Sequence, residues 1–185
     1  LPMQRAKLKV YPVTVVNLLG KYGDFEVDSD SDGYADQWAT WTIGMNAELA
    51  TNKVVTGNKS QHCWVDGITH RICTIRSSIT NIYRTNNTYF ASLWAYSTQE
   101  TTGKILYSSS PTLYVTLYGN ITSNQFNKHY TSFIAQNSGV AQLYYDFPLN
   151  GTQSDIYWDG LIVIDLTCMG VLPPPLKEYF NNVPS

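Results

Sequence analysis

The chain has 185 residues, a formal net charge of −2 and a charged fraction of only 14%. This length predicts a single domain with a core of its own, and the near-zero charge disfavours nucleic acid as a partner. No apolar run approaches the roughly 18–20 residues that a membrane-spanning helix needs, so we expect no membrane insertion.

Nearly every segment has the alternation, or the β-branched and aromatic composition, of a β-strand. The predicted strands, in chain order, are residues 8–16, 61–65, 68–79, 88–98, 111–119, 140–147 and 156–166. Pro12 interrupts the first of them, which predicts a position at a sheet edge. The one helix that the sequence predicts is short and begins at the prolines before Leu176.

Strands separated by Gly, Asn and Ser clusters predict an all-β fold, an antiparallel β-sandwich of the jelly-roll type. We expect residues 1–16 to form an N-terminal arm with an extra edge strand, residues 17–168 the jelly roll, and residues 169–185 a Pro-rich tail. The chain begins at Leu1 and not at Met, which predicts a processed product or an excised segment. Low charge with abundant Ser, Thr, Asn and Tyr favours an extracellular, cell-surface or virion location.

The segment 23–38, GDFEVDSDSDGYADQW, concentrates acidic side chains. Carboxylates that alternate along a tight loop converge, and a hard cation such as calcium neutralises them. Aligned with a calcium-binding loop, Gly33 falls at the sharp turn and Ala39 replaces the usual bidentate Glu, so a further ligand must come from elsewhere or the site is weak. The predicted ligands are the carboxylates of Asp28, Asp30, Asp32 and Asp36 and the backbone carbonyl of Tyr34. The alternative is a solvated acidic turn without an ion.

Carboxylates gathered on one loop do not suit glycoside hydrolysis, which needs two that face each other across a cleft. His62, His70 and His129 are isolated, without the spacing of a metal site. The sequence also lacks the nucleophile elbow, the phosphate loop and the dinucleotide fingerprint. We therefore expect no enzymatic activity.

The three cysteines are Cys63, Cys73 and Cys168, without a zinc-type pair. A disulfide between Cys63 and Cys73 would join two strand-like segments on either side of the Asp66-Gly67 turn. A two-residue turn, however, would place His70 and not Cys73 opposite Cys63, so both states of this pair stay open.

Residues 17–38 resemble the opening of jelly-roll modules related to carbohydrate-binding modules, which occur in phage tail and minor structural proteins and in secreted bacterial enzymes. Those modules begin with Asn-Leu-Leu, Gly-Asp-Phe-Glu and an Asp-rich stretch, and continue with a Gly-x-x-Ser-Gln element that Gly57, Ser60 and Gln61 match here. Residues 157–182, with an aromatic–Asp strand leading into Asp-Leu-Thr, are similar to their closing segment.

Two departures from this pattern are Gln37, where a Gly commonly precedes Trp38, and the prolines at 174–175. The second puts the conformation of the tail in question, but not the fold. The resemblance implies a structural calcium where the Phe-Glu of the first strand meets the Asp of the last. Carried over, Glu26 and Asp159 become candidate ligands, which either complete the acidic loop or form a separate site.

Sugar-binding faces of such sandwiches use aromatic rings, which stack on the C–H side of a pyranose. Strand alternation places some aromatic side chains on a shared face, and the candidates for a carbohydrate platform are Phe90, Trp94, Tyr96, Tyr114 and Tyr118. The alternative assigns these rings to the core of the sandwich.

Four N-x-S/T sequons, at Asn58, Asn86, Asn120 and Asn150, are surface predictions if the source glycosylates them.

Three functional hypotheses remain, in order of preference. The first is a non-enzymatic, calcium-stabilised structural subunit of a surface assembly, such as a phage tail-type module or a filament. Residues 1–16 would act there as a donor strand, and the partners would be copies of the chain or neighbouring subunits. The alternative is a carbohydrate-binding module that attaches to cell-surface or extracellular glycans, and a glycoside hydrolase comes third.

Overall fold

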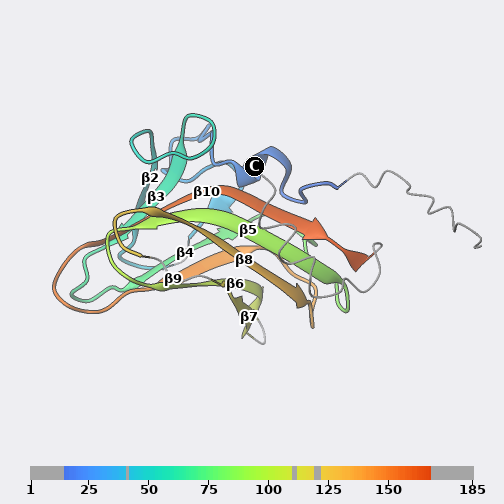
Figure 1. The fold of residues 1–185 in the computed structure, drawn as a ribbon. Coiled ribbons are helices and arrows are strands. Elements are labelled where there is room, and N and C mark those ends of the chain that lie inside the picture. The colour runs from blue at the N-terminus through green and yellow to red at the C-terminus, as the bar shows by residue number, and fades with distance from the viewer. Residues whose placement is uncertain (1–14, 41, 110–111, 119–121, 168–185) are drawn as a thin grey trace, which may run out of the picture.

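The protein is a sandwich of two antiparallel β-sheets, as the sequence predicts (Figure 1). The computed structural model describes residues 15–40, 42–109, 112–118 and 122–167. A short 3-10 helix, η1 (Gly20–Gly23), precedes the sandwich. The strands are β1 (Trp38–Ala39), β2 (Asn46–Ala50), β3 (Ser60–Val65), β4 (Ile72–Ser77), β5 (Thr88–Ser97), β6 (Thr102–Ser109), β7 (Thr112–Thr116), β8 (Phe126–Ile134), β9 (Gln142–Asp146) and β10 (Ser154–Asp165).

One sheet has the order β1-β4-β9-β6-β7 and is called the β9 sheet below; the other has the order β2-β3-β10-β5-β8 and is called the β10 sheet. Most consecutive strands, such as β3 and β4 or β9 and β10, belong to opposite sheets. This repeated crossing is the jelly-roll pattern. In Figure 1 the β10 sheet lies above the β9 sheet.

The core fills the space between the sheets. Along β5, Tyr89, Ala91, Leu93 and Ala95 point inward and are fully buried, as the alternation of a strand requires. Trp158 of β10 is also completely buried. Each large apolar side chain buried in this way contributes about 1.5–3 kcal/mol to folding.

A β-bulge in β10 changes which side chains face the core. The pairing with β5 shifts register between Asp159 and Ile162, and Gly160 has a positive φ of 57°. The extra residue places both Trp158 and Leu161 in the core, which strict alternation would forbid. Asp159 comes before the bulge and next to the inward Trp158, so ordinary alternation turns it to the opposite side, toward the loop between β2 and β3.

The strands β1, β2, β6 and β8 are additional to those that the sequence predicts. The predicted strand 8–16 falls mainly outside the described residues, and Val15 and Val16 lie in no strand. The short tail helix and Cys168 also lie outside the described residues. In the described part of the chain, no helix is long and apolar enough to span a membrane.

Candidate functional site

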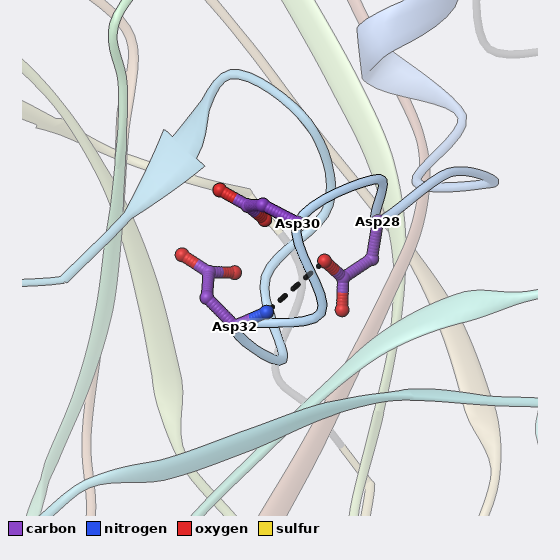
Figure 2. Close-up of side chains that lie close together, drawn as sticks. All are labelled: Asp28, Asp30 and Asp32. Carbon is purple, nitrogen blue, oxygen red and sulfur yellow. Dashed lines mark hydrogen bonds between the residues drawn. The ribbon is translucent and has the colours of Figure 1, made fainter.

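Three carboxylates meet in the loop before β1, where the sequence predicts a cation. One oxygen each of Asp28, Asp30 and Asp32 lies within 4.8 Å of the others (Figure 2). The Asp28 carboxylate accepts hydrogen bonds from the backbone N–H groups of Asp32 (3.2 Å) and Gly33 (3.0 Å), which fold the loop around it. Asp30 and Asp32 are exposed. The loop therefore gathers carboxylate oxygens of the kind that calcium prefers.

Gly33 and Gln61 attach this loop to the sandwich. Gly33 has φ +89°, and a Cβ there would lie 2.4 Å from the backbone oxygen of Ala47. The buried Gln61 accepts a hydrogen bond from Ala35 N (2.8 Å) and donates one to Gly33 O (2.9 Å). Tyr34 packs its half-buried ring against the core, and burial raises the pKa of its hydroxyl to about 12.

Asp36 does not join the other three acids. Its carboxylate accepts hydrogen bonds from the backbone N–H (2.8 Å) and the hydroxyl (2.9 Å) of Ser29, and these bonds lower the pKa of Asp36. Its backbone N–H donates to Val27 O at 2.6 Å. Asp36 thus closes the base of the loop instead of contributing an oxygen to the group.

Glu26 and Asp159 form a second acidic group with Asp24, a residue that the sequence analysis missed. Glu26 accepts hydrogen bonds from the backbone N–H groups of residues 58 and 59 (2.8 and 3.3 Å). The fully buried Asp159 accepts bonds from the N–H groups of residues 55 and 56 (2.6 and 2.9 Å) and from the Thr56 hydroxyl (2.7 Å). Burial, followed by the negative charges of Asp159 and Glu26, raises the pKa of Asp24. Neither Glu26 nor Asp159 belongs to the close group on the acidic loop.

The five candidate aromatic residues do not form one platform. Phe90, Trp94 and Tyr96 share the outer face of β5 in the β10 sheet, but Phe90 and Tyr96 are only 4% and 9% exposed. Tyr114 belongs to β7 in the β9 sheet, and Tyr118 forms an isolated bridge with β8. The set is divided because β5 and β7 belong to opposite sheets.

The outer face of the β9 sheet combines exposed rings with polar side chains. Lys104 of β6 lies between two tyrosines, with its Nζ 4.6 Å from the ring centroid of Tyr114 and 5.6 Å from that of Tyr144. The register places Lys104 opposite Tyr144 of β9, which itself lies opposite Thr74 of β4. Gln142 donates to the Thr74 hydroxyl at 3.0 Å.

We call this surface the β9 face, defined by the outward side chains of Thr74, Arg76, Lys104, Tyr114, Gln142 and Tyr144. Of these, the sequence analysis named only Tyr114. The alternation of "QLYYD", with Leu143 and Tyr145 buried and Tyr144 half-buried, was the available signal for β9.

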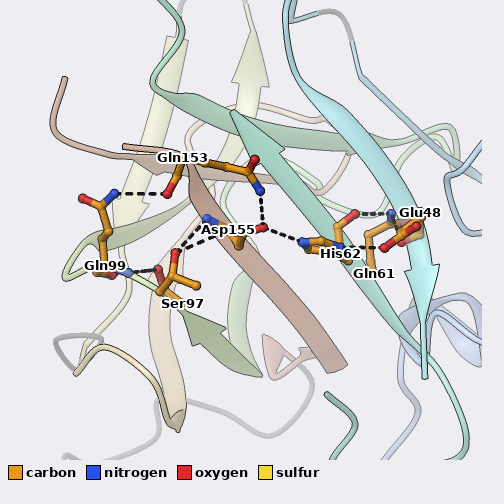
Figure 3. A network of polar contacts seen from close by, with 8 residues as sticks. Glu48, Gln61, His62, Ser97, Gln99, Gln153 and Asp155 are labelled. Atoms are coloured by element: carbon orange, nitrogen blue, oxygen red, sulfur yellow. Dashed lines mark hydrogen bonds and ion pairs between the residues drawn. The ribbon is translucent and has the colours of Figure 1, made fainter. Parts of the chain in front are cut away.

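His62 joins three strands of the β10 sheet. Its Nδ1 lies 3.0 Å from Glu48 Oε1 and its Nε2 lies 3.0 Å from Asp155 Oδ1 (Figure 3). The ring stacks on Tyr157 at 4.1 Å between centroids and on Trp64 at 4.7 Å. Among the described residues, no hydroxyl or thiol lies at hydrogen-bond distance from either ring nitrogen. The arrangement therefore cross-links strands and does not form a nucleophile–base pair.

The disulfide that the sequence left open is not present in the structure, where Cys63 and Cys73 are both free, buried thiols. Cys63 belongs to β3 and Cys73 to β4, and these strands pair with other strands in opposite sheets. The hairpin geometry that the sequence suggested therefore does not arise. Burial raises the pKa of both thiols.

Three sequons, Asn58, Asn86 and Asn150, are exposed in loops, and Asn120 lies outside the described residues. Their glycosylation stays a prediction.

No protein-family model matches the chain, and no curated protein matches it. Among solved structures, the CBM22-1 xylan-binding domain of Paenibacillus barcinonensis Xyn10C is similar, with a TM-score of 0.56 and 12% identity over 74% of this chain and 90% of that one. The C-terminal family 22 carbohydrate-binding module of Clostridium thermocellum Xyn10B is also similar, with a TM-score of 0.55 and 18% identity over 80% of this chain and 99% of that one.

A domain of a phage protein is similar as well. The enzymatically active domain of bacteriophage CBA120 tailspike protein 4 has a TM-score of 0.54 and 13% identity over 80% of this chain, but only 21% of the tailspike chain is covered. At these identities the likeness concerns the fold alone. The chain therefore has the jelly-roll fold of carbohydrate-binding modules, as its sequence resemblance predicts.

Proposed function

We propose that this protein is a non-catalytic carbohydrate-binding module and that the β9 face is its binding surface. The observation that carries the proposal is the row formed by Tyr114, Lys104 and Tyr144, in which two rings flank a cation on an open strand face. Tyr114 is 50% exposed. An exposed ring on a rigid strand can stack on a sugar, and amide, hydroxyl and ammonium groups beside it can bind the sugar hydroxyls.

The similar solved structures support this choice between the two leading hypotheses. Two of them are described as a xylan-binding domain and as a module whose cleft residues act in ligand binding. Non-catalytic neighbours are also compatible with the expected lack of enzymatic activity. A glycan-binding role fits the predicted extracellular or cell-surface location.

The test compares Tyr114 and Tyr144, which belong to the β9 face, with Tyr118, which does not. A panel of soluble plant, algal and bacterial polysaccharides is run in affinity electrophoresis against the full chain and its variants. We expect at least one polysaccharide to retard the protein, and Y114A and Y144A to lose most of this retardation. Tyr118 is 54% exposed but lies off the β9 face, so Y118A is the matched control and should behave like the wild type. Equal loss in all three variants, or no retardation by any polysaccharide, would contradict the proposal.

We also propose that calcium stabilises the acidic loop through Asp28, Asp30 and Asp32. Their oxygens lie close enough to share one cation, and such a cation would remove their mutual repulsion. The ion would supply loop rigidity and no catalytic chemistry. Glu26, Tyr34, Asp36 and Asp159 stay predicted ligands without geometric support in this group.

Removal of the ion should lower the melting temperature. Calcium at a hundredfold excess over its Kd would contribute about 2.7 kcal/mol, which corresponds to roughly 5–10 °C for a domain of this size. The full chain is scanned by calorimetry with calcium and with a chelator. The variant D30N/D32N should lose the response, and E100Q, which removes an exposed acid outside the loop, should keep it. Identical melting of the wild type in both buffers would rule out the ion.

The structural-subunit hypothesis stays a prediction, since the proposed donor strand and the tail lie largely outside the described residues. The tailspike likeness is the observation that favours it. Electron microscopy of the purified protein would separate the two functions, because a binding module should appear monomeric and a filament subunit polymeric.

A further inference from the structure

Positively charged side chains outnumber negatively charged ones on the outer side of the β9 sheet. On the described strands of this sheet, the outward charged side chains are Arg76, Lys104 and Asp146. Asp146 is already paired with Arg71, which precedes β4, through an Nε–Oδ1 contact of 3.0 Å and an Nη2–Oδ2 contact of 3.1 Å. This fork satisfies the only carboxylate among those strand residues. The four charges therefore sum to a surplus of positive charge, although the whole chain has a net charge of −2.

The sequence on either side of β7 adds no charged side chain to this count. The side chains of residues 106–113 and 119–121 include no Asp, Glu, Lys or Arg. Within the described part of the chain, Lys104 has no carboxylate within the 4.0 Å of an ion pair, and its ammonium group contacts only the rings of Tyr114 and Tyr144. Its charge thus faces outward between the two aromatic groups.

Acidic groups gather elsewhere on the molecule. The acidic loop carries Asp28, Asp30 and Asp32. On the outer side of the β10 sheet, Glu48 and Asp155 are balanced by Lys53 and Lys128, so these four charges cancel. An anionic polymer approaching the protein would be repelled from the acidic loop and attracted to the β9 face. The surplus of positive charge and the row of Tyr114, Lys104 and Tyr144 therefore lie on the same surface.

From this juxtaposition we propose that the ligand of the β9 face is an anionic polysaccharide, with carboxylate or sulfate groups that bind Lys104 and Arg76 while the tyrosine rings stack on its sugars. The inference rests on the proposed function and specifies its ligand class. A neutral chain could use the rings but would offer no anionic group to Lys104. A carboxylate or sulfate at the edge of a stacked sugar places its charge beside the ammonium group, where a charge-assisted hydrogen bond forms.

The experiment measures binding of the full chain by calorimetry to polygalacturonate, dextran sulfate, neutral xylan and dextran. We expect polygalacturonate or dextran sulfate to bind at least about tenfold more tightly than either neutral polymer, a difference of about 1.4 kcal/mol. The two anionic polymers distinguish carboxylate from sulfate. Raising the salt to about 0.5 M should weaken this binding several-fold, because exposed charges are then screened.

Two lysine variants provide the matched comparison. K104Q should weaken binding of the anionic polymer by about fivefold or more, as expected for the loss of one ion-pair contact. K128Q removes a lysine on β8 of the other sheet, where it lies 5.7 Å from the ring centroid of Trp94, and should change affinity less than twofold. Equal effects of the two variants would overturn the proposal, because they would indicate only a general charge effect.

Each failure has a different meaning. Binding of xylan or dextran as tight as that of the anionic polymers, insensitive to K104Q but lost in Y114A and Y144A, would overturn the ligand class and leave the proposed function intact. No binding to any of the four polymers would overturn the ligand class, and the wider panel described above would then decide the proposed function. Tighter binding of a single-stranded oligonucleotide than of both anionic polysaccharides would also overturn the inference.

Discussion

His129 makes the stability of the protein depend on pH in a way that can be calculated. The residue lies on β8 opposite the core residue Leu93, and its side chain is fully buried. Neither ring nitrogen has a hydrogen-bond partner among the residues that the structure describes. The groups that face it are aromatic: Tyr145 of β9 lies 6.2 Å away between ring centroids, and Trp158 of β10 lies behind that tyrosine. Burial without a compensating carboxylate in the described part of the chain lowers the pKa of His129 from 6.5 to about 4.

The direction in which the free energy of unfolding changes with pH depends on whether the folded or the unfolded chain binds the proton more tightly. Between pH 6.5 and 4 the unfolded chain binds a proton that the folded chain does not, so the free energy of unfolding falls as the pH falls. The complete loss is the difference between 6.5 and about 4 multiplied by 1.36 kcal/mol per pH unit, or about 3.4 kcal/mol. At pH 5.0 the loss has reached about 2 kcal/mol relative to pH 7.5.

Urea unfolding of the wild type and of H129L at pH 7.5 and pH 5.0 tests this calculation. Leucine has no titratable group and suits the apolar surroundings, so H129L should lose about 2 kcal/mol less than the wild type between the two pH values. Subtracting the two proteins removes the contributions of all the other titratable groups, which they share. If the two stabilities fell in parallel, His129 would not be the buried neutral group that the structure describes.

Three further predictions concern the loops and the core. Replacement of Gln61 by Leu leaves Ala35 N and Gly33 O without partners and should cost about 2–4 kcal/mol in urea unfolding, and a loss below 1 kcal/mol would contradict the anchoring role. D159A leaves the backbone N–H groups of residues 55 and 56 without their acceptor and should make residues 51–59 more sensitive to proteolysis, and unchanged cleavage would argue against this contact. A reducing agent should leave the melting temperature unchanged, since Cys63 and Cys73 are free, and a drop would indicate a disulfide.

The sequence predicts the fold class because the strands with the clearest patterns are also the central ones. The predicted segments 88–98 and 156–166 correspond to β5 and β10, whose alternation or apolar composition comes from burial on both sides. β2, β6 and β8 were missed because they are edge strands or carry many polar residues, as in "FNKHYTSFI", so their patterns resemble those of loops. The expected hairpin between the segments of Cys63 and Cys73 was wrong, because a turn signal does not reveal whether the two strands that flank it stay in one sheet.

The acidic loop was the most predictable part of the candidate site, since all its members lie within nine residues, Asp28 to Asp36. Local spacing placed Asp28, Asp30 and Asp32 together correctly. It could not anticipate that Ser29 would engage the Asp36 carboxylate. The group of Asp24, Glu26 and Asp159 depends on β10 and on the loop before β3, which connect positions more than a hundred residues apart.

The location of the proposed binding face was the hardest feature to predict, because exposure of a ring depends on what covers it. On the outer side of the β10 sheet, Tyr96 packs on Tyr157 and Phe126, and Lys53 lies over it at 4.4 Å from the ring centroid. This covering leaves Tyr96 only 9% exposed, whereas Tyr114, on the edge strand β7, is 50% exposed. Strand alternation alone places both Tyr96 and Tyr114 on an outer face, so it does not distinguish the covered ring from the exposed one. The difference arises from side chains of β8 and β10 and from the loop between β2 and β3, and for that reason an aromatic strand pattern becomes a functional prediction only once the covering segments are known.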